Sequence, residues 1–256
     1  MTKTAKLVVR IERSHPDRVE EFHVERRPNA NIISVLMQIQ RDPVTGDGKK
    51  TTPPAWDAAC LEEVCGSCTM NINGKVRQAC STLIDKLTEP IHIAPMRKFP
   101  LVRDLTVDRS KMFDALKRVH AWVPLDGTYD LGPGPRQASE EADTRYLLST
   151  CMTCGCCLEV CPQVSQTTSF IGAAAISQVR LFNSHPTGEM NKADRLHGLM
   201  GDGGVGDCGK AANCVEACPK GIPLTTSIAE MARETTKQAL KDFFRRDERK
   251  SGGGPA

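Results

Sequence analysis

Twelve cysteines in three groups are the feature that most restricts how this chain of 256 residues can fold. A chain of this length can bury a core without disulfides, so the cysteines are not required for stability. The N-terminal stretch MTKTAKLVVRIERSHPDR is charged throughout and has no apolar signal core, so we expect no export to an oxidising compartment. Cysteines in a cytosolic chain bind metal more often than they form disulfides. The sequence therefore predicts metal centres.

The first group has the spacing of a plant-type 2Fe-2S site. It reads C-x4-C-x2-C followed by a fourth cysteine, and comprises Cys60, Cys65, Cys68 and Cys80. The segment reads as a loop, in which backbone N-H groups can point at sulfur and Gly66 allows close approach of the chain. Four cysteines also make a closed zinc site, but zinc sites usually contain two C-x2-C pairs and this stretch contains one. The spacing favours 2Fe-2S over zinc.

The second and third groups are two copies of one motif. CMTCGCCLEVCP at 151–162 contains the bacterial ferredoxin run C-x2-C-x2-C-x3-C-P, whose fourth cysteine ligates the other cluster of a pair. CGKAANCVEACP at 208–219 repeats the run, with Ala211 where the second ligand is expected. The crossover rule assigns four ligands to a 4Fe-4S cluster: Cys151, Cys154, Cys157 and Cys218.

The other cluster receives only three thiolates, from Cys161, Cys208 and Cys214. Three protein ligands suit a 3Fe-4S cluster, and a 4Fe-4S cluster with one non-cysteine ligand is the alternative. Cys156 lies outside the motif, and we interpret it as a small buried residue.

Patterns of apolar residues predict a strand-rich first part. AKLVVRIER at 5–13 and EEFHVER at 20–26 read as strands, and apolar spacing predicts a helix within 28–42. MNINGKVRQAC at 70–80 reads as a hairpin around Asn73 and Gly74, and PIHIAPM at 90–96 as a closing strand. A small mixed sheet with one crossing helix is the expected assembly.

The second part reads as helical. Asp108 can cap a helix over 110–122, and the Gly- and Pro-rich stretch at 124–137 reads as a linker or surface loop. Helical segments at 139–149, 167–183, 188–200 and 225–246 are separated by cysteine-bearing turns. We place the domain boundary between 110 and 111 and predict a disordered tail over 244–256.

Composition restricts the function. With 34 basic and 31 acidic residues, the formal net charge is +3, which favours neither nucleic-acid binding nor an acidic tail. No apolar run approaches the roughly 20 residues that span a bilayer, so membrane association requires a partner. No GxGxxG motif, P-loop or Ser-His-Asp spacing is recognisable. The sequence predicts a protein that moves electrons between clusters.

These motifs resemble the iron-sulfur subunit of succinate dehydrogenase and fumarate reductase over nearly the whole chain. The resemblance is carried by CLEEVCGSC with Cys80, FPLVRDLTVD at 99–108, CMTCGCCLEVCP, and NCVEACPKGIP at 213–223. The segment SFIGAAAISQVRLFNSHPTGEMNKADRL resembles the menaquinone-linked enzymes of Gram-positive bacteria, whose anchor is a di-haem cytochrome b.

The resemblance implies an α+β chain: a β-grasp plant-type ferredoxin domain over 1–110 and an all-α bacterial-type ferredoxin domain over 111–256. It implies the same eleven cluster ligands as the spacing. It also implies two partners, a flavoprotein with FAD that oxidises succinate and a cytochrome b anchor that handles quinone, menaquinone in this subtype. Electrons would pass from FAD through the 2Fe-2S, 4Fe-4S and 3Fe-4S clusters to quinone, on the cytoplasmic side of the bacterial membrane.

One departure concerns the quinone site. Ubiquinone-linked relatives have a tryptophan after the first CP and a histidine after the first cysteine of the last group, where this chain has residues around Gln166 and Gly209. Neither Trp56 nor Trp122 can replace that tryptophan by position, so quinone contacts do not carry over. Pro162 still matches the family, either as a quinone contact or as the end of the cluster loop.

Three other functions remain open on the sequence. The same subunit serves quinol:fumarate reductases, because a cysteine count does not give the direction of the reaction. A soluble multi-cluster carrier is compatible with two ferredoxin domains. A zinc-bound interaction module is the third.

Overall fold

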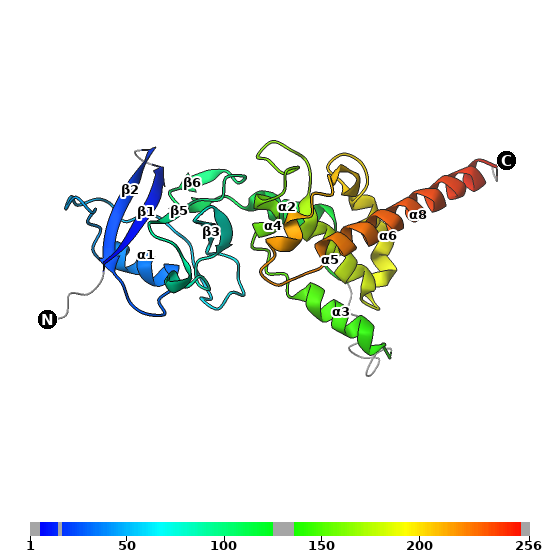
Figure 1. Ribbon diagram of the computed structural model, residues 1–256. Helices are drawn as coiled ribbons and strands as arrows, with labels where there is room; N and C mark the ends of the chain where they lie inside the picture. The colour runs from blue at the N-terminus through cyan, green and yellow to red at the C-terminus, as the bar shows by residue number, and fades with distance from the viewer. Residues whose placement is uncertain (1–5, 15–16, 125–135, 252–256) are drawn as a thin grey trace. The chain divides into compact units, whose positions relative to one another are not determined.

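The computed structural model describes residues 6–14, 17–124 and 136–251 (Figure 1). The chain divides into two compact units, the first formed by residues 1–110 and 152–160 and the second by residues 111–151 and 161–256. The boundary predicted between 110 and 111 assigns 152–160 to the second domain, whereas the structure packs this segment in the first unit. Most of the predicted linker at 124–137 lies outside the described residues.

A five-stranded mixed sheet, in the order β2-β1-β5-β3-β4, forms the first unit. The strands are β1 (Lys6–Ser14), β2 (Asp17–Glu25), β3 (Thr69–Ile72), β4 (Lys75–Gln78) and β5 (Ile91–Ala94). Strand β1 pairs antiparallel with β2 and parallel with β5, while β3 pairs antiparallel with both β4 and β5. The strand predicted at 90–96 therefore lies inside the sheet. A short ribbon of β6 (Leu101–Arg103) and β7 (Thr106–Val107) follows it.

One face of this sheet is covered by α1 (Ile32–Arg41), and the apolar residues of both form the core. Leu7, Val9 and Ile11 alternate along β1 and are all 0% exposed, as expected for a strand with one face buried. Asn31 caps α1 by accepting a hydrogen bond from the Ser34 N-H at 2.9 Å. These contacts hold together the sheet and α1, to which the first cysteine loop is connected.

The second unit is helical. Its helices are α2 (Ser110–Arg118), which begins at the boundary, α3 (Ser139–Ser149), α5 (Gly172–Ser184), α6 (Lys192–Gly198), α7 (Asn213–Glu216) and α8 (Leu224–Ser251). Among the described residues there are also three 3-10 turns, Ile84–Lys86 in the first unit and Gly188–Asn191 and Val205–Asp207 in the second. Helix α5 packs against α8, with Ser177, Arg180 and Asn183 of α5 in contact with Ser227, Glu230 and Met231 of α8.

A buried arginine holds the helical unit together. Arg195 of α6 is 0% exposed and donates to the carbonyl oxygens of His120 (3.1 Å), Trp122 (2.8 Å) and Gly188 (2.6 Å) and to Asn183 Oδ1 (3.1 Å). These hydrogen bonds satisfy its guanidinium donors, as a buried charge requires.

The C-terminal prediction is partly wrong. Helix α8 continues to Ser251, so residues 244–251 are helical rather than a disordered tail, and residues 252–256 lie outside the described residues. Among the described residues, no helix is both long and apolar enough to cross a membrane.

Candidate metal centres

The loop with the first cysteine group directs backbone N-H groups at sulfur. The Cys60 sulfur accepts from three of them, those of Glu62 (3.4 Å), Val64 (3.3 Å) and Cys65 (3.3 Å). The Cys65 sulfur accepts from the N-H groups of Cys60 (3.4 Å) and Ser67 (3.5 Å). Such donors stabilise thiolates that carry cluster charge. The donor set fits the predicted 2Fe-2S site.

The four thiols of this group differ in environment. A hydrogen bond from Ser67, aided by the backbone of Cys60, lowers the pKa of Cys65 to about 6. Burial, together with the adjacent Cys80, raises the pKa of Cys68 to about 11. The proton is therefore easier to remove from Cys65 than from Cys68, and metal binding replaces the proton of each thiol that it ligates.

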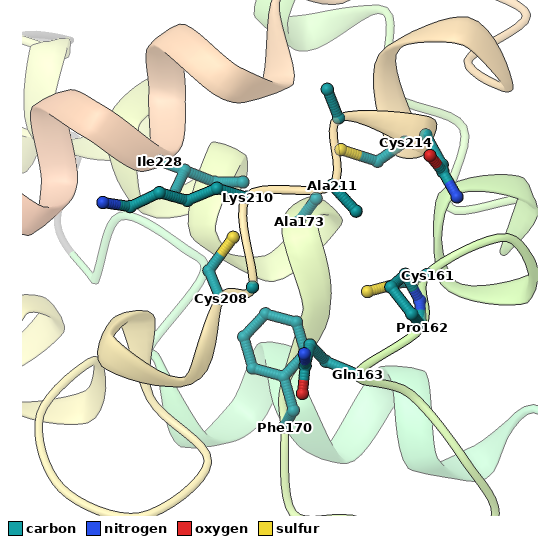
Figure 2. Close-up of a pocket in the computed structure, with 13 residues that line it drawn as sticks. Cys161, Pro162, Gln163, Phe170, Ala173, Cys208, Lys210, Ala211, Cys214 and Ile228 are labelled. Carbon is teal, nitrogen blue, oxygen red and sulfur yellow. The ribbon is translucent and has the colours of Figure 1, made fainter.

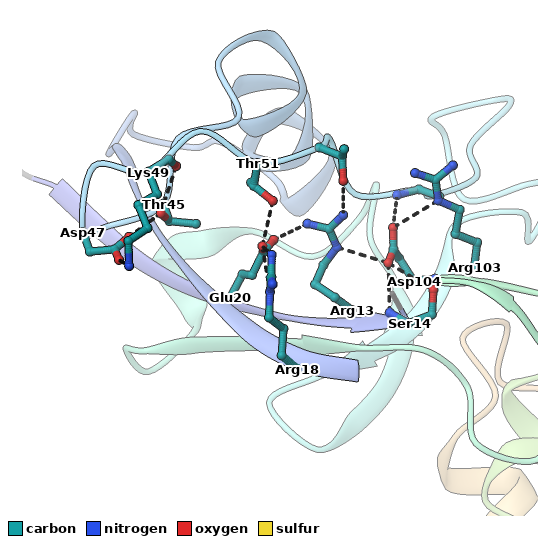
Figure 3. A network of polar contacts seen from close by, with 12 residues as sticks. Arg13, Ser14, Arg18, Glu20, Thr45, Asp47, Lys49, Thr51, Arg103 and Asp104 are labelled. Atoms are coloured by element: carbon teal, nitrogen blue, oxygen red, sulfur yellow. Dashed lines mark hydrogen bonds and ion pairs between the residues drawn. The ribbon is translucent and has the colours of Figure 1, made fainter. Parts of the chain in front are cut away.

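A buried charge network ties the start of this loop to the sheet (Figure 3). The Arg13 guanidinium donates to Glu20 and, over 3.1 Å, to Asp104 Oδ1. The Asp104 carboxylate also accepts from the N-H groups of Ser14 (3.0 Å) and Ala55 (2.8 Å). Burial disfavours ionisation of Asp104, but these hydrogen bonds and the Arg13 charge outweigh burial and lower its pKa. Since Ala55 precedes Cys60 by only five positions, this network anchors the loop.

The segment 152–160 of the second cysteine run packs in the first unit through Glu159. This residue ends the one-turn helix α4 (Cys156–Glu159) and is 9% exposed. Its carboxylate accepts from Asn71 Nδ2 (3.1 Å) and from the backbone N-H groups of Arg97 (2.7 Å) and Lys98 (3.1 Å). Three donors compensate the burial of this carboxylate.

Gly66 brings the 2Fe-2S loop into contact with Cys154. Its φ of +68° is left-handed, and a Cβ there would lie 2.6 Å from Cys154 Cα. Its carbonyl accepts from Arg109 Nη1 at 2.7 Å.

A hydrogen bond with Cys156, aided by the Arg109 charge, lowers the pKa of Cys154 to about 7. Cys154 and the buried Cys157 belong to the first unit, and the remaining predicted 4Fe-4S ligands, Cys151 and Cys218, belong to the second.

The two bacterial-type runs repeat each other in backbone conformation as well as in sequence. Thr153 (φ 50°) and Gly155 (φ 88°) are left-handed in the first run, and Lys210 (φ 56°) and Ala212 (φ 62°) are left-handed at the equivalent places of the second. Each run continues into a four-residue helix, α4 or α7. The motif thus specifies one turn that is used twice, although the second copy has alanine where the first has glycine.

The three cysteines predicted for the second cluster converge in the helical unit (Figure 2). Their sulfurs point into one pocket of about 340 Å³ of empty space, open solvent included. Its lining includes Cys161, Cys208, Cys214 and Ala211. Burial, and then the negative charge of the other two thiolates, raises the pKa of Cys214. Three thiols line this pocket, and Ala211 lies beside them without offering a fourth ligand. This arrangement fits a three-iron cluster.

The same pocket places the side chain of Gln163 beside Gly209. A Cβ on Gly209 would lie 2.4 Å from Nε2 at the end of this exposed side chain, which would have to move to make room. Pro162 and Phe170 also line the pocket.

Trp56 packs against the sheet core, and Trp122 lies beside His120 with ring centroids 5.2 Å apart. Neither tryptophan lines the pocket.

Sequence reasoning missed the supporting residues. Asp104, Arg109 and Gln78 act through tertiary contacts that no cysteine spacing predicts. Two signals were available: Asp104 lies within FPLVRDLTVD, and Glu159 in LEVCP recurs as Glu216 in VEACP.

Comparisons with known proteins agree with this geometry. The chain matches the family of 2Fe-2S iron-sulfur cluster binding domains over residues 6–114 and that of 4Fe-4S dicluster domains over residues 147–222. It is 60% identical over 228 residues to the succinate dehydrogenase iron-sulfur subunit of Bacillus subtilis, covering 89% of this chain and 90% of that one.

Two further similarities are more distant. The fumarate reductase iron-sulfur subunit of Wolinella succinogenes is 31% identical over 220 residues, which are 84% of this chain and 88% of that one. A chain of the Mycobacterium smegmatis Sdh1 complex in the apo form shares the fold, with a TM-score of 0.77 at 24% identity. That likeness covers 92% of this chain and 98% of that chain.

Proposed function

Because the chain belongs to the family of iron-sulfur subunits of succinate dehydrogenase and fumarate reductase, we propose that it conducts electrons between a flavoprotein and a quinone-reducing membrane anchor. It is the electron-transfer subunit of a succinate dehydrogenase and contains 2Fe-2S, 4Fe-4S and 3Fe-4S clusters. When bound, these clusters supply reversible one-electron transfer. The dicarboxylate chemistry belongs to the partner.

The proposed ligands follow the three cysteine groups. Cys60, Cys65, Cys68 and Cys80 hold the 2Fe-2S cluster; Cys151, Cys154, Cys157 and Cys218 the 4Fe-4S cluster; Cys161, Cys208 and Cys214 the 3Fe-4S cluster. The observation that carries this proposal is the pocket in which three thiols meet beside Ala211. Around these ligands, backbone N-H groups donate hydrogen bonds to the Cys60 sulfur. The burial of Cys68, Cys80 and Cys214 excludes water from these thiols.

Two exposed surfaces support the proposed partners. Leu61 and Val64 flank the first ligands and are 52% and 62% exposed, which suits docking of a flavoprotein with FAD beside the 2Fe-2S loop. Phe243 and Phe244 near the end of α8 are 60% and 62% exposed, which suits contact with a cytochrome b anchor, expected to be di-haem. The chain would then lie on the cytoplasmic side of the bacterial membrane, held there by the anchor.

Menaquinone is the proposed acceptor. The chain has Gly209 where ubiquinone-linked relatives have a histidine, so that contact has no counterpart here. Pro162 lines the three-cysteine pocket and is the one family position left as a quinone contact on this chain. The anchor is therefore proposed to supply most of the quinone site.

Quinol:fumarate reduction is the alternative direction. It is favoured by the fumarate reductase subunits among the relatives, and the same ligands and partners would serve it. A redox titration of the three centres in the complex decides between the directions, because net flow follows the potentials.

The test is anaerobic purification of the tagged chain from its native membrane, followed by metal analysis and electron paramagnetic resonance. We expect iron without stoichiometric zinc, a three-iron signal in the oxidised protein, and co-purification of a flavoprotein and a haem-containing membrane protein. A colourless zinc protein would contradict electron transfer. Recovery of the chain without partners would support a soluble carrier instead.

A further inference from the structure

Arg109 is a half-buried cation that contacts the first cysteine loop. The backbone on either side of it is held in place. The Asp108 N-H donates to the Pro100 carbonyl at 2.8 Å, and the Asp108 carboxylate accepts from the Ser110 N-H at 2.8 Å, where α2 begins. The Arg109 side chain therefore extends from a backbone segment that these hydrogen bonds fix.

The guanidinium binds the main chain of this loop between two of the proposed 2Fe-2S ligands. Arg109 Nη1 donates to the carbonyl of Gly66, at 2.7 Å, and Gly66 lies between Cys65 and Cys68 in the sequence. Gly66 also contacts the second cysteine run, because a Cβ on it would lie 2.6 Å from Cys154 Cα and 2.8 Å from Cys154 Cβ. All of these residues belong to the first unit. Arg109 thus places a positive charge where the 2Fe-2S loop meets a ligand proposed for the 4Fe-4S cluster.

No acidic side chain neutralises this charge. In the part of the chain that the structure describes, no carboxylate forms an ion pair with Arg109, whose hydrogen bond goes to a carbonyl. Arg13 and Arg10 of the same unit differ, because Arg13 pairs with two carboxylates and Arg10 with Glu21. Charges removed from water usually have a partner of opposite sign. An iron-sulfur cluster with four thiolate ligands carries net negative charge, so the bound clusters would supply that partner.

We propose that the Arg109 guanidinium raises the midpoint potentials of both the 2Fe-2S and the 4Fe-4S cluster, by holding an unneutralised positive charge where their loops meet. Each cluster takes up one electron from its donor, and a nearby cation stabilises the negative charge that is added. The charge acts on both clusters because Gly66 follows Cys65 in the chain and contacts Cys154. The inference rests on the proposed function, through the ligands assigned to these two clusters.

The test changes Arg109 in the intact complex and follows the three clusters by redox titration and electron paramagnetic resonance. Arg109→Gln removes the charge but keeps an N-H donor for the Gly66 carbonyl. We expect the ratio of reduced to oxidised cluster at a fixed potential to fall about tenfold for 2Fe-2S and 4Fe-4S, which is about 59 mV for one electron. The 3Fe-4S potential should not move, because none of its three proposed ligands belongs to the first unit.

Two further variants separate the charge from the hydrogen bond and from a general loss of positive charge. Arg109→Lys keeps a cation at this place and should keep both potentials near the wild-type values. Arg10→Gln is the matched control, because it removes the same charge from a side chain that is 48% exposed and lies 3.0 Å from the Glu21 carboxylate. This control should leave all three potentials unchanged, since solvent screens an exposed charge. Iron content and line shapes should stay the same in the three variants.

The inference is overturned if Arg109→Gln leaves both potentials in place, or if Arg109→Lys lowers them as much as Arg109→Gln does. A shift confined to one cluster would contradict the shared effect, and loss of iron from both Arg109 variants would assign a structural role to the side chain instead. Failure of the proposed function looks different: Cys154→Ser would leave the 4Fe-4S signal unaltered, showing that Cys154 is not a ligand.

Discussion

At the scale of single residues, the absence of a thiol at Ala211 determines which type of cluster the helical unit is expected to hold. Ala211 lines the pocket of Cys161, Cys208 and Cys214, at the place where the repeated motif has Cys154 in its other copy. A methyl group cannot bind iron, so in the proposed ligand sets this turn supplies two ligands, Cys208 and Cys214, where its twin supplies three, Cys151, Cys154 and Cys157. The backbone of the turn is otherwise the same in both copies.

Ala211→Cys should therefore complete the ligand set. We expect the oxidised three-iron signal to be replaced by a four-iron signal in the reduced protein, with a lower potential, measured by electron paramagnetic resonance and redox titration. Ala212→Ser, one position along the same loop, is the matched control and should keep the three-iron signal. Absence of that signal from the wild type would contradict the assignment.

Asp104 links the 2Fe-2S loop to the sheet. Asp104→Asn removes one of the two buried carboxylates that pair with Arg13, the other being Glu20, and should lower the free energy of unfolding by about 2 kcal/mol. The measurement is the urea concentration at which 2Fe-2S absorbance is lost. The control is Asp47→Asn, whose exposed contact with Lys49 should matter little. Equal effects of the two variants would refute a structural role for the buried network.

The pH dependence follows from the same carboxylate. Because the pKa of Asp104 is lower when folded than its usual value of 3.8, its contribution is complete above that value. It is lost as the pH falls from there through the folded pKa. We expect the resistance of the wild type to urea to drop in this acidic window, and Asp104→Asn to show a smaller drop.

At the scale of elements, local sequence patterns predicted the turns and helices that depend on residues close together in the chain. The hairpin turn at Asn73 and Gly74 forms because both residues tolerate positive φ, which here is 50° and 75°. Helix α3 occupies the predicted residues 139–149. The attachment of α4 to the first unit was not predictable, because it depends on Glu159 meeting Asn71 and two backbone N-H groups distant in sequence. The cysteine spacing predicts a ligand set but none of these supporting contacts.

Gly66 offers a test of this attachment. Gly66→Ala combines a left-handed φ with a clash against Cys154, whereas Gly74→Ala has a similar φ of +75° but nothing within 4 Å of the new methyl group. We expect Gly66→Ala to broaden or abolish the 4Fe-4S signal and Gly74→Ala only to lower stability by about 1 kcal/mol. Similar spectra for the two variants would show that close approach to Cys154 is unimportant.

At the scale of the whole molecule, neither unit is one continuous stretch of the chain. The first unit is completed by residues 152–160, which are encoded after the start of the second. A fragment of residues 1–110 would therefore lack the acceptor for the Arg97 and Lys98 N-H groups. We expect trypsin to cut after Arg97 and Lys98 faster in that fragment than in the full chain, while cleavage after Arg41, at the end of α1, serves as the reference. Equal rates at all three sites would argue against this stabilising role.

The insertion of 152–160 into the first unit also has a consequence for synthesis on the ribosome. The sheet, α1 and the first cysteine loop are all translated by residue 110, but the segment that covers Gln78 and Asn71 ends 50 residues later, at residue 160. At about 5–20 residues per second, the nascent first unit waits roughly 3–10 s with Gln78 and Gly66 uncovered. During that interval the 2Fe-2S loop lacks its contact with Cys154, which can form only after the segment with α4 has been translated.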